Sequence, residues 1–264
     1  YFYRSIMRWI TGIFVQIDPI GILKSYVDDL KNNLVKMNKQ IAQLRGQMHK
    51  LQEIIVTNRK SIESNLTIAK AARDQDKQNL MVLKARKAGR LQDSNVKLED
   101  LYKKMEILYR VLNRMYDNSE IMLEDIQDQV MVKEQERNAI RASHSAMKSA
   151  MNIIAGNSDQ RYMFDQALEA IADDVSNKVG EMERFMDMST NFMDSIDLQN
   201  GIFEEEGLNM LEKWEKEGVS LILGSEKDKL ILEANDPKKI LDLDAPAQTM
   251  KALDHKNQYD KFFE

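Results

Sequence analysis

The sequence predicts an all-α protein built around a long antiparallel coiled-coil hairpin, with amphipathic helices before and after it. The chain has 264 residues and only 3 prolines, none of which lies between Ile20 and Asp236. Because proline is the residue that most reliably stops a helix, this stretch permits very long helices. The 10 glycines and the single Asn200-Gly201 pair are too few turn signals for a sheet protein. Apolar residues also repeat every seven positions over much of the chain, as they do in coiled coils.

The first long helix is predicted to start at Asp18-Pro19, where Asp caps the helix and Pro occupies its first position. Steps of four and three, typical of a coiled-coil seam, then connect Leu23, Val27, Leu30, Leu34, Met37, Ile41, Leu44, Met48, Leu51 and Ile55, and we expect the seam to resume at Ile62, Leu66 and Ala69. Polar Asn58 sits at one seam position, where it would fix the register. A hairpin turn is expected near residues 73–77.

The second helix completes a hairpin domain predicted over residues 18–156. Its seven-residue repeat runs through Leu91, Leu98, Met105, Leu112, Ile126, Ile140, Met147 and Ile154. Ser119 and Lys133 interrupt the repeat, so we expect the stretch after about residue 118 to leave the first helix. Other copies of the chain would then have to cover the apolar flanks of this second helix and all of the third helix.

Residues 157–217 are predicted to form acidic amphipathic helices used for assembly. Gly156 and the following Asn-Ser-Asp end the hairpin, and a third helix is expected to reach about residue 199. A short fourth helix from Phe203 to about Glu217 carries apolar Leu208, Leu211 and Trp214. Residues 218–264 are predicted to be a linker or tail, with 219–223 and 259–263 as docking segments.

Charge is distributed unevenly along the chain. The net charge is −5, yet residues 1–98 carry 18 basic and 8 acidic side chains, whereas residues 99–264 carry 20 and 35. This asymmetry predicts an anionic partner at the basic end or a contact between copies. The densest basic cluster is Lys84, Arg86, Lys87 and Arg90. Because no aromatic residues or reading motif accompany it, we interpret it as a self-assembly contact and expect no nucleic-acid partner.

Residues 1–17 are predicted to form an amphipathic membrane-binding helix. The membrane-contacting residues we expect are Arg4, Ile6, Arg8, Trp9, Ile10, Ile13 and Phe14. An aromatic apolar stripe flanked by arginines, with no acidic residue before Asp18, suits the interface of an anionic membrane. Two other interpretations are that the stripe packs on its own bundle, or that it ends a signal peptide or membrane span. Arg8 and Gln16 leave too short an apolar run for the latter.

Motifs for enzymatic chemistry are missing from the sequence. It contains no phosphate-binding Gly-rich loop, no nucleophile elbow and no His-Glu-x-x-His pattern. His49, His144 and His255 lie far apart in the sequence, and there is no cysteine. We therefore expect no enzyme, no cofactor and no metal site.

The order of these elements resembles the phage shock protein A family, which includes the vesicle-inducing protein of plastids and belongs with the ESCRT-III proteins. The local likenesses are Asp18-Pro19 followed by Leu23 to Leu34, Ala69-Lys70-Ala71-Ala72-Arg73 at the hairpin tip, and Met182-Glu183-Arg184 after the break. They cover about residues 1–217. The Gly-Arg-Glu-Asp-Leu-Ala-like run often seen near the family's hairpin tip is only loosely echoed by residues 73–80.

This resemblance implies an ESCRT-III-like fold and a cytoplasmic protein, peripheral on the inner face of a membrane. It implies assembly of the chain with itself into filaments, rods or rings, binding to anionic lipids, and protection or remodelling of the membrane, with room for a regulatory protein partner. The helix with Phe203, Leu208, Leu211 and Trp214 would lie across neighbouring hairpins. Two alternatives are a coiled-coil scaffold without a membrane role and an α-helical pore-forming toxin.

Overall fold

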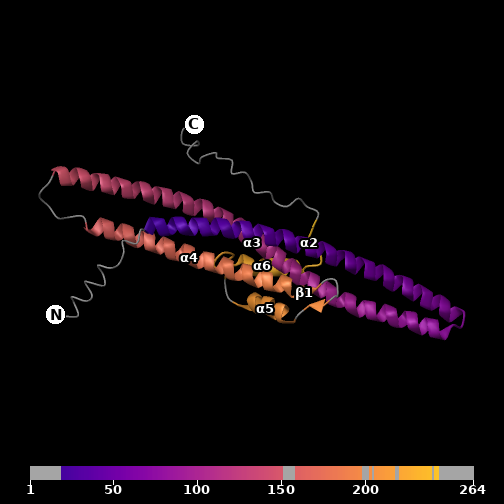
Figure 1. Cartoon of the computed structure of the whole chain (residues 1–264). Helices are drawn as coiled ribbons and strands as arrows, with labels where there is room; N and C mark the ends of the chain where they lie inside the picture. The colour runs from indigo at the N-terminus through magenta and orange to yellow at the C-terminus, as the bar shows by residue number, and fades with distance from the viewer. Residues whose placement is uncertain are drawn as a thin grey trace.

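Two long helices form an antiparallel hairpin that sets the length of the molecule (Figure 1). A computed structural model describes residues 19–150, 158–197, 202–203, 205–217, 220–239 and 241–243. Helix α2 spans Pro19–Asp74 and helix α3 spans Gln78–Ala150. The connection at residues 75–77 falls within the stretch where the turn was expected. Asp76 takes a left-handed φ of 55° there, a conformation that Asp adopts more readily than most residues.

The hairpin pairing extends along the whole of α2. Lys24 contacts Glu134 at 2.9 Å, and Arg59 contacts Glu99 at 2.8 Å, which is the same antiparallel register. The expectation that α3 leaves its partner after about residue 118 is therefore wrong. Ser119, at which the apolar repeat is interrupted, is completely buried. A small residue at a seam position lets the two helices approach closely and does not separate them.

Large aliphatic side chains fill the seam in the half of the hairpin nearer the start of α2. The fully buried members include Leu23, Leu30, Met37, Leu44, Met48 and Leu51 from α2, and Met105, Leu108, Val111 and Leu112 from α3. Each such side chain contributes roughly 1.5–3 kcal/mol when it leaves water. The regular seam read from the sequence up to Ile55 accounts for this part of the core.

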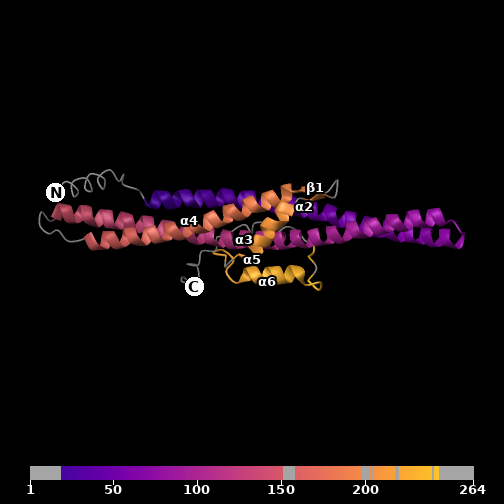
Figure 2. The ribbon, with the colours of Figure 1, turned by 90° about the horizontal axis from the view of Figure 1, so that it is seen from below.

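Helix α4, Ser158–Asp194, lies along the same half of the hairpin as a third helix (Figure 2). It runs parallel to α2, because the Asn33 side-chain amide donates to Glu183 and the Gln40 amide donates to Thr190 at the same sequence offset. Its buried face includes Leu168, Val175, Met182, Phe185 and Phe192. The expectation that this helix lacks an intramolecular partner is therefore wrong, since α2 covers it.

Two short strands and a short helix follow α4. Strand β1, Ile196–Asp197, pairs antiparallel with β2, Ile202–Phe203. Helix α5, Glu205–Lys216, then packs back on α4. The rings of Phe185 of α4 and Trp214 of α5 lie against each other, with centroids 4.6 Å apart and planes tilted by 55°. The antiparallel pairing of β1 with β2 reverses the chain direction, and α5 then lies on the chain's own bundle.

The described residues that follow α5 are folded against the bundle, in a stretch where the sequence predicted a linker or tail. Residues 220–239 and 241–243, named here the C-terminal strap, contain helix α6, Glu226–Asn235. The Glu181 carboxylate of α4 accepts hydrogen bonds from the Leu221 and Ile222 backbone amides at 2.8 and 3.1 Å. At the far end, the Leu243 carbonyl faces Arg45 and His49 of α2.

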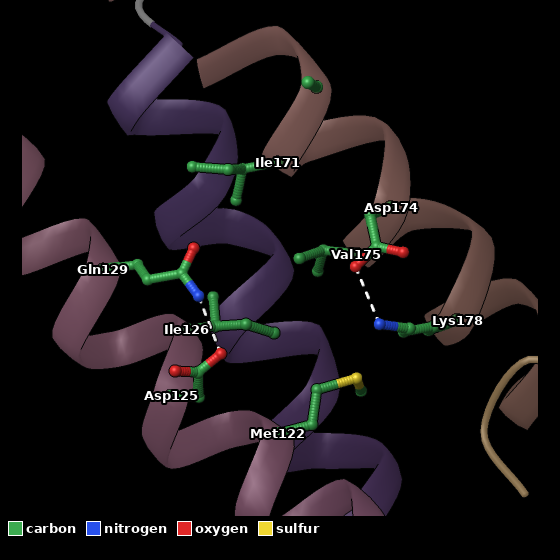
Figure 3. Close-up of a pocket in the computed structure, with 9 residues that line it drawn as sticks. Met122, Asp125, Ile126, Gln129, Ile171, Asp174, Val175 and Lys178 are labelled. Atoms are coloured by element: carbon green, nitrogen blue, oxygen red, sulfur yellow. Dashed lines mark hydrogen bonds and ion pairs between the residues drawn. The ribbon is translucent and has the colours of Figure 1, made fainter. Parts of the chain in front are cut away.

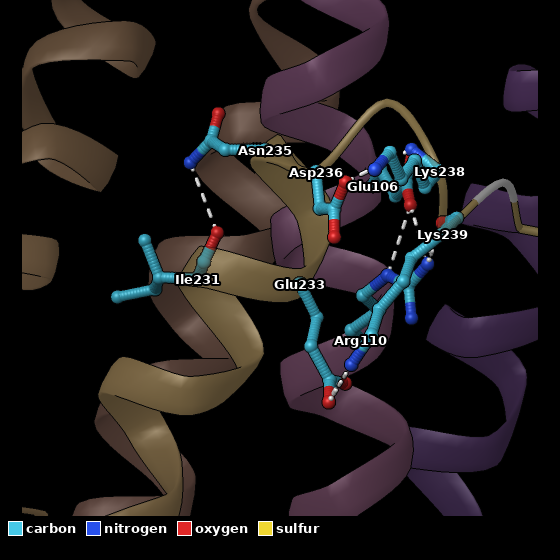
Figure 4. A network of polar contacts seen from close by, with 8 residues as sticks. All are labelled: Glu106, Arg110, Ile231, Glu233, Asn235, Asp236, Lys238 and Lys239. Carbon is cyan, nitrogen blue, oxygen red and sulfur yellow. Dashed lines mark hydrogen bonds and ion pairs between the residues drawn. The ribbon is translucent and has the colours of Figure 1, made fainter.

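Helix α6 is fixed on α3 by charged side chains. The Arg114 guanidinium forms a bidentate salt bridge with the Glu226 carboxylate: Nη2 donates to Oε1 at 2.6 Å and Nε donates to Oε2 at 2.7 Å. Arg110 binds Glu106 of its own helix and the Lys239 carbonyl of the strap, and Lys239 in turn contacts Glu233 at 2.7 Å (Figure 4). The strap therefore crosses from α4 over α3 to α2 around the middle of the bundle.

Candidate functional site

The distal part of the hairpin, residues 56–98, extends as two bare helices beyond α4, α5 and the strap (Figure 1, Figure 2). We call it the tip. No other described element covers it, so its surface is available for contacts with other molecules. The sequence placed its basic cluster here, and the structure adds which side chains face outward.

Small and polar residues dominate the seam of the tip. Its buried members are Asn65, Ala69 and Ala72 from α2, and Ala88 and Asn95 from α3, with Leu98 of α3 as the one large aliphatic residue among them, where the tip joins the body. A strict continuation of the alternating three and four steps from Ile55 leads through Asn58, Ile62 and Asn65. Leu66, expected in the seam, is instead 44% exposed. That expectation is wrong because the seam follows helix geometry and not the nearest apolar residue.

Large aliphatic side chains consequently lie on the outside of the tip. The exposed ones are Val56, Leu66, Ile68, Leu80, Val82, Leu83 and Val96. Leu83 is 64% exposed and lies directly before the basic cluster. Single exposed leucines are ordinary, but several on one two-helix tip indicate a contact surface.

The tip is strongly basic, with ten basic and four acidic side chains between Arg59 and Lys97. Arg86, Lys87 and Arg90 are exposed, and Lys84 is half-buried. Among the described residues, none of these four has a hydrogen bond or ion pair to another side chain. Their charges are therefore available for contact with an outside partner.

An acidic stretch of α3 lies on the other side of the strap. Between Asp117 and Glu136 this helix carries seven acidic side chains and one lysine. The residues Ile121, Glu124, Asp128 and Met131 recur at steps of three and four, so they share one face of the helix. All four are exposed, Ile121 by 68% and Met131 by 52%. We call them the acidic ridge, a surface that sequence reasoning missed.

The groove between α3 and α4 is a poor binding site for a small molecule. Ile126 and Val175 meet across it, with Met122 and Ile171 beside them (Figure 3). Its polar groups are paired with their own neighbours, since Gln129 donates to Asp125 and Lys178 binds Asp174, each at 2.7 Å. In the described part of the chain, no three His, Asp or Glu side chains gather as metal ligands.

The short-helix residues expected to meet neighbouring hairpins are used within the chain. Leu211 is completely buried, Leu208 packs on the core, and Trp214 lies against Phe185. Phe203 belongs to strand β2. Since α5 already has its apolar face on α4, it offers little apolar surface to a second copy in this arrangement.

The residues expected to contact the membrane, Arg4, Ile6, Arg8, Trp9, Ile10, Ile13 and Phe14, lie outside the described residues. Among the helices that are described, none combines the length and hydropathy needed to cross a bilayer.

Comparison with known proteins finds no matching family model, no matching curated protein and no matching solved structure.

Proposed function

We propose that this chain is a self-assembling peripheral membrane protein of the ESCRT-III kind, which binds anionic membranes and protects or remodels them. The observation that carries the proposal is the separation of charge along a rod. At one end lies a basic tip, whose cluster Lys84, Arg86, Lys87 and Arg90 has no side-chain partner among the described residues, and at the other lies an acidic three-helix body. A rigid dipolar rod favours contacts between unlike ends of successive copies.

The shape of the molecule supports assembly into an open polymer. A contact between two different surfaces of identical subunits generates a filament whenever its rotation does not close a ring. The tip and the body are different surfaces, and both carry exposed aliphatic side chains. We infer a cytoplasmic polymer in which the hairpins are the rods.

The membrane part of the proposal is supported by the sequence of residues 1–17. The apolar side chains Trp9, Ile10 and Phe14 would enter the interface, and each contributes up to roughly 1.5–3 kcal/mol when fully buried, less at the bilayer surface. Arg4 and Arg8 would add about 1 kcal/mol each near anionic lipid. The apolar contribution is therefore expected to dominate.

Self-assembly is tested by sedimentation velocity and light scattering on the purified chain at micromolar concentration. We expect large, polydisperse particles that appear as rods or rings by negative-stain microscopy. A monodisperse monomer would reject the proposed function.

Membrane binding is tested by co-sedimentation with anionic and with neutral liposomes. Deleting residues 1–17 should abolish binding to anionic liposomes while leaving assembly intact. Trp9→Ala with Phe14→Ala should weaken binding more than Arg4→Ala with Arg8→Ala. Equal binding by the truncated and intact chains would show that membrane contact lies elsewhere, and an assembly without any lipid binding would favour the plain scaffold.

A further inference from the structure

We infer that the acidic ridge on α3 is the docking surface for the basic tip of a second copy of this chain. This inference rests on the proposed function and specifies the contact between copies. Its partner is identified by complementary charge together with matching exposed aliphatic residues.

The two surfaces have corresponding patterns on the same kind of scaffold. On the tip, exposed Leu83 is followed at steps of three and four by Arg86 and Arg90. On the ridge, exposed Ile121 is followed at the same steps by Glu124 and Asp128. When the two helices are laid side by side, the apolar residue of one can therefore lie against an apolar residue of the other. The two arginines of the tip then face the two carboxylates of the ridge.

The surfaces cannot meet within one molecule. Leu83 and Ile121 belong to one continuous helix and are 38 positions apart, which is about 57 Å at 1.5 Å per residue. Contact between them thus requires two copies, and it joins unlike surfaces, so it continues indefinitely unless the rotation closes.

The strap leaves the ridge open. Its contacts with α3 include those of Glu226 with Arg114 and of the Ile222 carbonyl with Asn118, and Asn118 lies just before the first ridge residue. Glu124 and Asp128 have no hydrogen bond or ion pair to another side chain in the described part of the chain. The ridge is therefore an exposed acidic and apolar surface that begins where internal packing by the strap ends.

An anionic membrane or a nucleic acid is a less suitable partner for the contact as a whole. Either could bind the basic tip, but the acidic ridge would repel both. Only a second copy uses the two surfaces at once.

Charge exchange tests the inference on the 264-residue chain. Reversing the tip by Arg86→Glu with Arg90→Glu, or the ridge by Glu124→Lys with Asp128→Lys, should raise the concentration for half-assembly by about tenfold or more, because like charges then oppose each other. Combining all four substitutions should restore assembly towards the unaltered value. The control is Asp228→Lys, an exposed reversal on α6, which should leave assembly unchanged.

The absence of cysteine from the sequence allows a second measurement. Disulfide-linked oligomers should form under mild oxidation in one of two double-cysteine variants. Leu83→Cys with Ile121→Cys should crosslink if the two helices lie parallel, and Leu83→Cys with Met131→Cys if they lie antiparallel. Leu83→Cys combined with Leu232→Cys, which uses a leucine 71% exposed on α6, should crosslink less.

The outcomes separate this inference from the proposed function. Two results would show that the docking inference is wrong while the proposed function stands. In the first, the unaltered chain assembles but the variant with all four charge reversals does not regain assembly. In the second, the control Leu83→Cys with Leu232→Cys crosslinks as well as the test pairs do. If tip reversal leaves assembly intact but weakens liposome binding of the chain lacking residues 1–17, the tip is a lipid site, which also overturns it. A monomeric unaltered chain rejects both.

Discussion

The ammonium group of Lys227 lies 4.4 Å from the centroid of the Trp214 indole ring, and it donates to the backbone carbonyls of Trp214 and Glu217. Lys227 is on α6 and only 4% exposed, and the two carbonyls lie at the end of α5. A cation there is favoured by the helix dipole and by the face of the indole ring. This one side chain therefore joins α6 to α5, and through Trp214 and Phe185 to α4.

Replacing Lys227 by Gln should detach the strap from α5. The variant loses the charge over the ring and weakens the hydrogen bonds to two carbonyls, so we expect a loss of about 1–3 kcal/mol in the free energy of unfolding. The measurement is denaturant unfolding followed by tryptophan fluorescence. Lys229→Gln, an exposed site on the same helix, is the control and should change stability by less than about 0.5 kcal/mol. Equal effects at both positions would contradict this role.

Gly207 at the start of α5 should not tolerate a side chain. A Cβ added there would overlap the Ser195 side chain and lie 3.5 Å from the Phe192 Cα, so Gly207→Ala should cost about 1–3 kcal/mol by overpacking. Adding Ser195→Gly should recover part of that loss, as measured by thermal unfolding. Gly180→Ala is the control: nothing lies within 4 Å of its added Cβ, and it should stabilise α4 by roughly 0.5–1 kcal/mol.

The contact between Arg114 and Glu226 should make docking of α6 sensitive to acid. The hydrogen bond from Arg114 lowers the pKa of Glu226 from 4.5 to about 2. A depressed pKa contributes stability that is fully present above the unfolded value and is lost as pH falls through the folded one. The strap should therefore loosen between about pH 4.5 and pH 2.

This pH dependence is measured by hydrogen exchange of the α6 amides at pH 5 and pH 3, compared between variants at each pH. Glu226→Gln should remove most of the difference in protection, whereas Asp228→Asn on the same helix should retain it. Identical pH dependence in Glu226→Gln would assign the effect to other carboxyl groups.

Two leucines of α2 that the sequence pattern treats alike should respond differently to truncation. Leu51 is fully buried in the seam and Leu66 is 44% exposed at the tip. Leu51→Ala should cost about 2–5 kcal/mol, and Leu66→Ala should cost well under that because it leaves no cavity. Unfolding has to be compared at one protein concentration, since assembly adds to apparent stability. A large loss from Leu66→Ala at a dilution where the chain is monomeric would contradict the exposed position of Leu66 at the tip.

The helical content and the hairpin could be predicted from the sequence because they depend on local rules. A chain without proline from Ile20 to Asp236 permits long helices, and the regular run from Leu23 to Ile55 can bury its apolar side chains only along one seam. The basic cluster at Lys84 to Arg90 was also evident, since charge counting needs no structure. These features are fixed by the chemistry of neighbouring residues.

The tertiary structure decided how these helices share their surfaces. The sequence could not indicate that α2 covers α4, because a parallel offset between residues 33 and 183 depends on packing across 150 positions. Nor could it indicate that the strap crosses the bundle, since its anchors, Glu181 for the loop and Arg114 for α6, are single polar side chains without a motif. At the tip, strict helix geometry placed Asn65 inside and Leu66 outside. The proline-free sequence and the regular apolar pattern therefore determined the long helices of the hairpin. Only the spatial register of the helices determined which apolar and charged residues remain exposed.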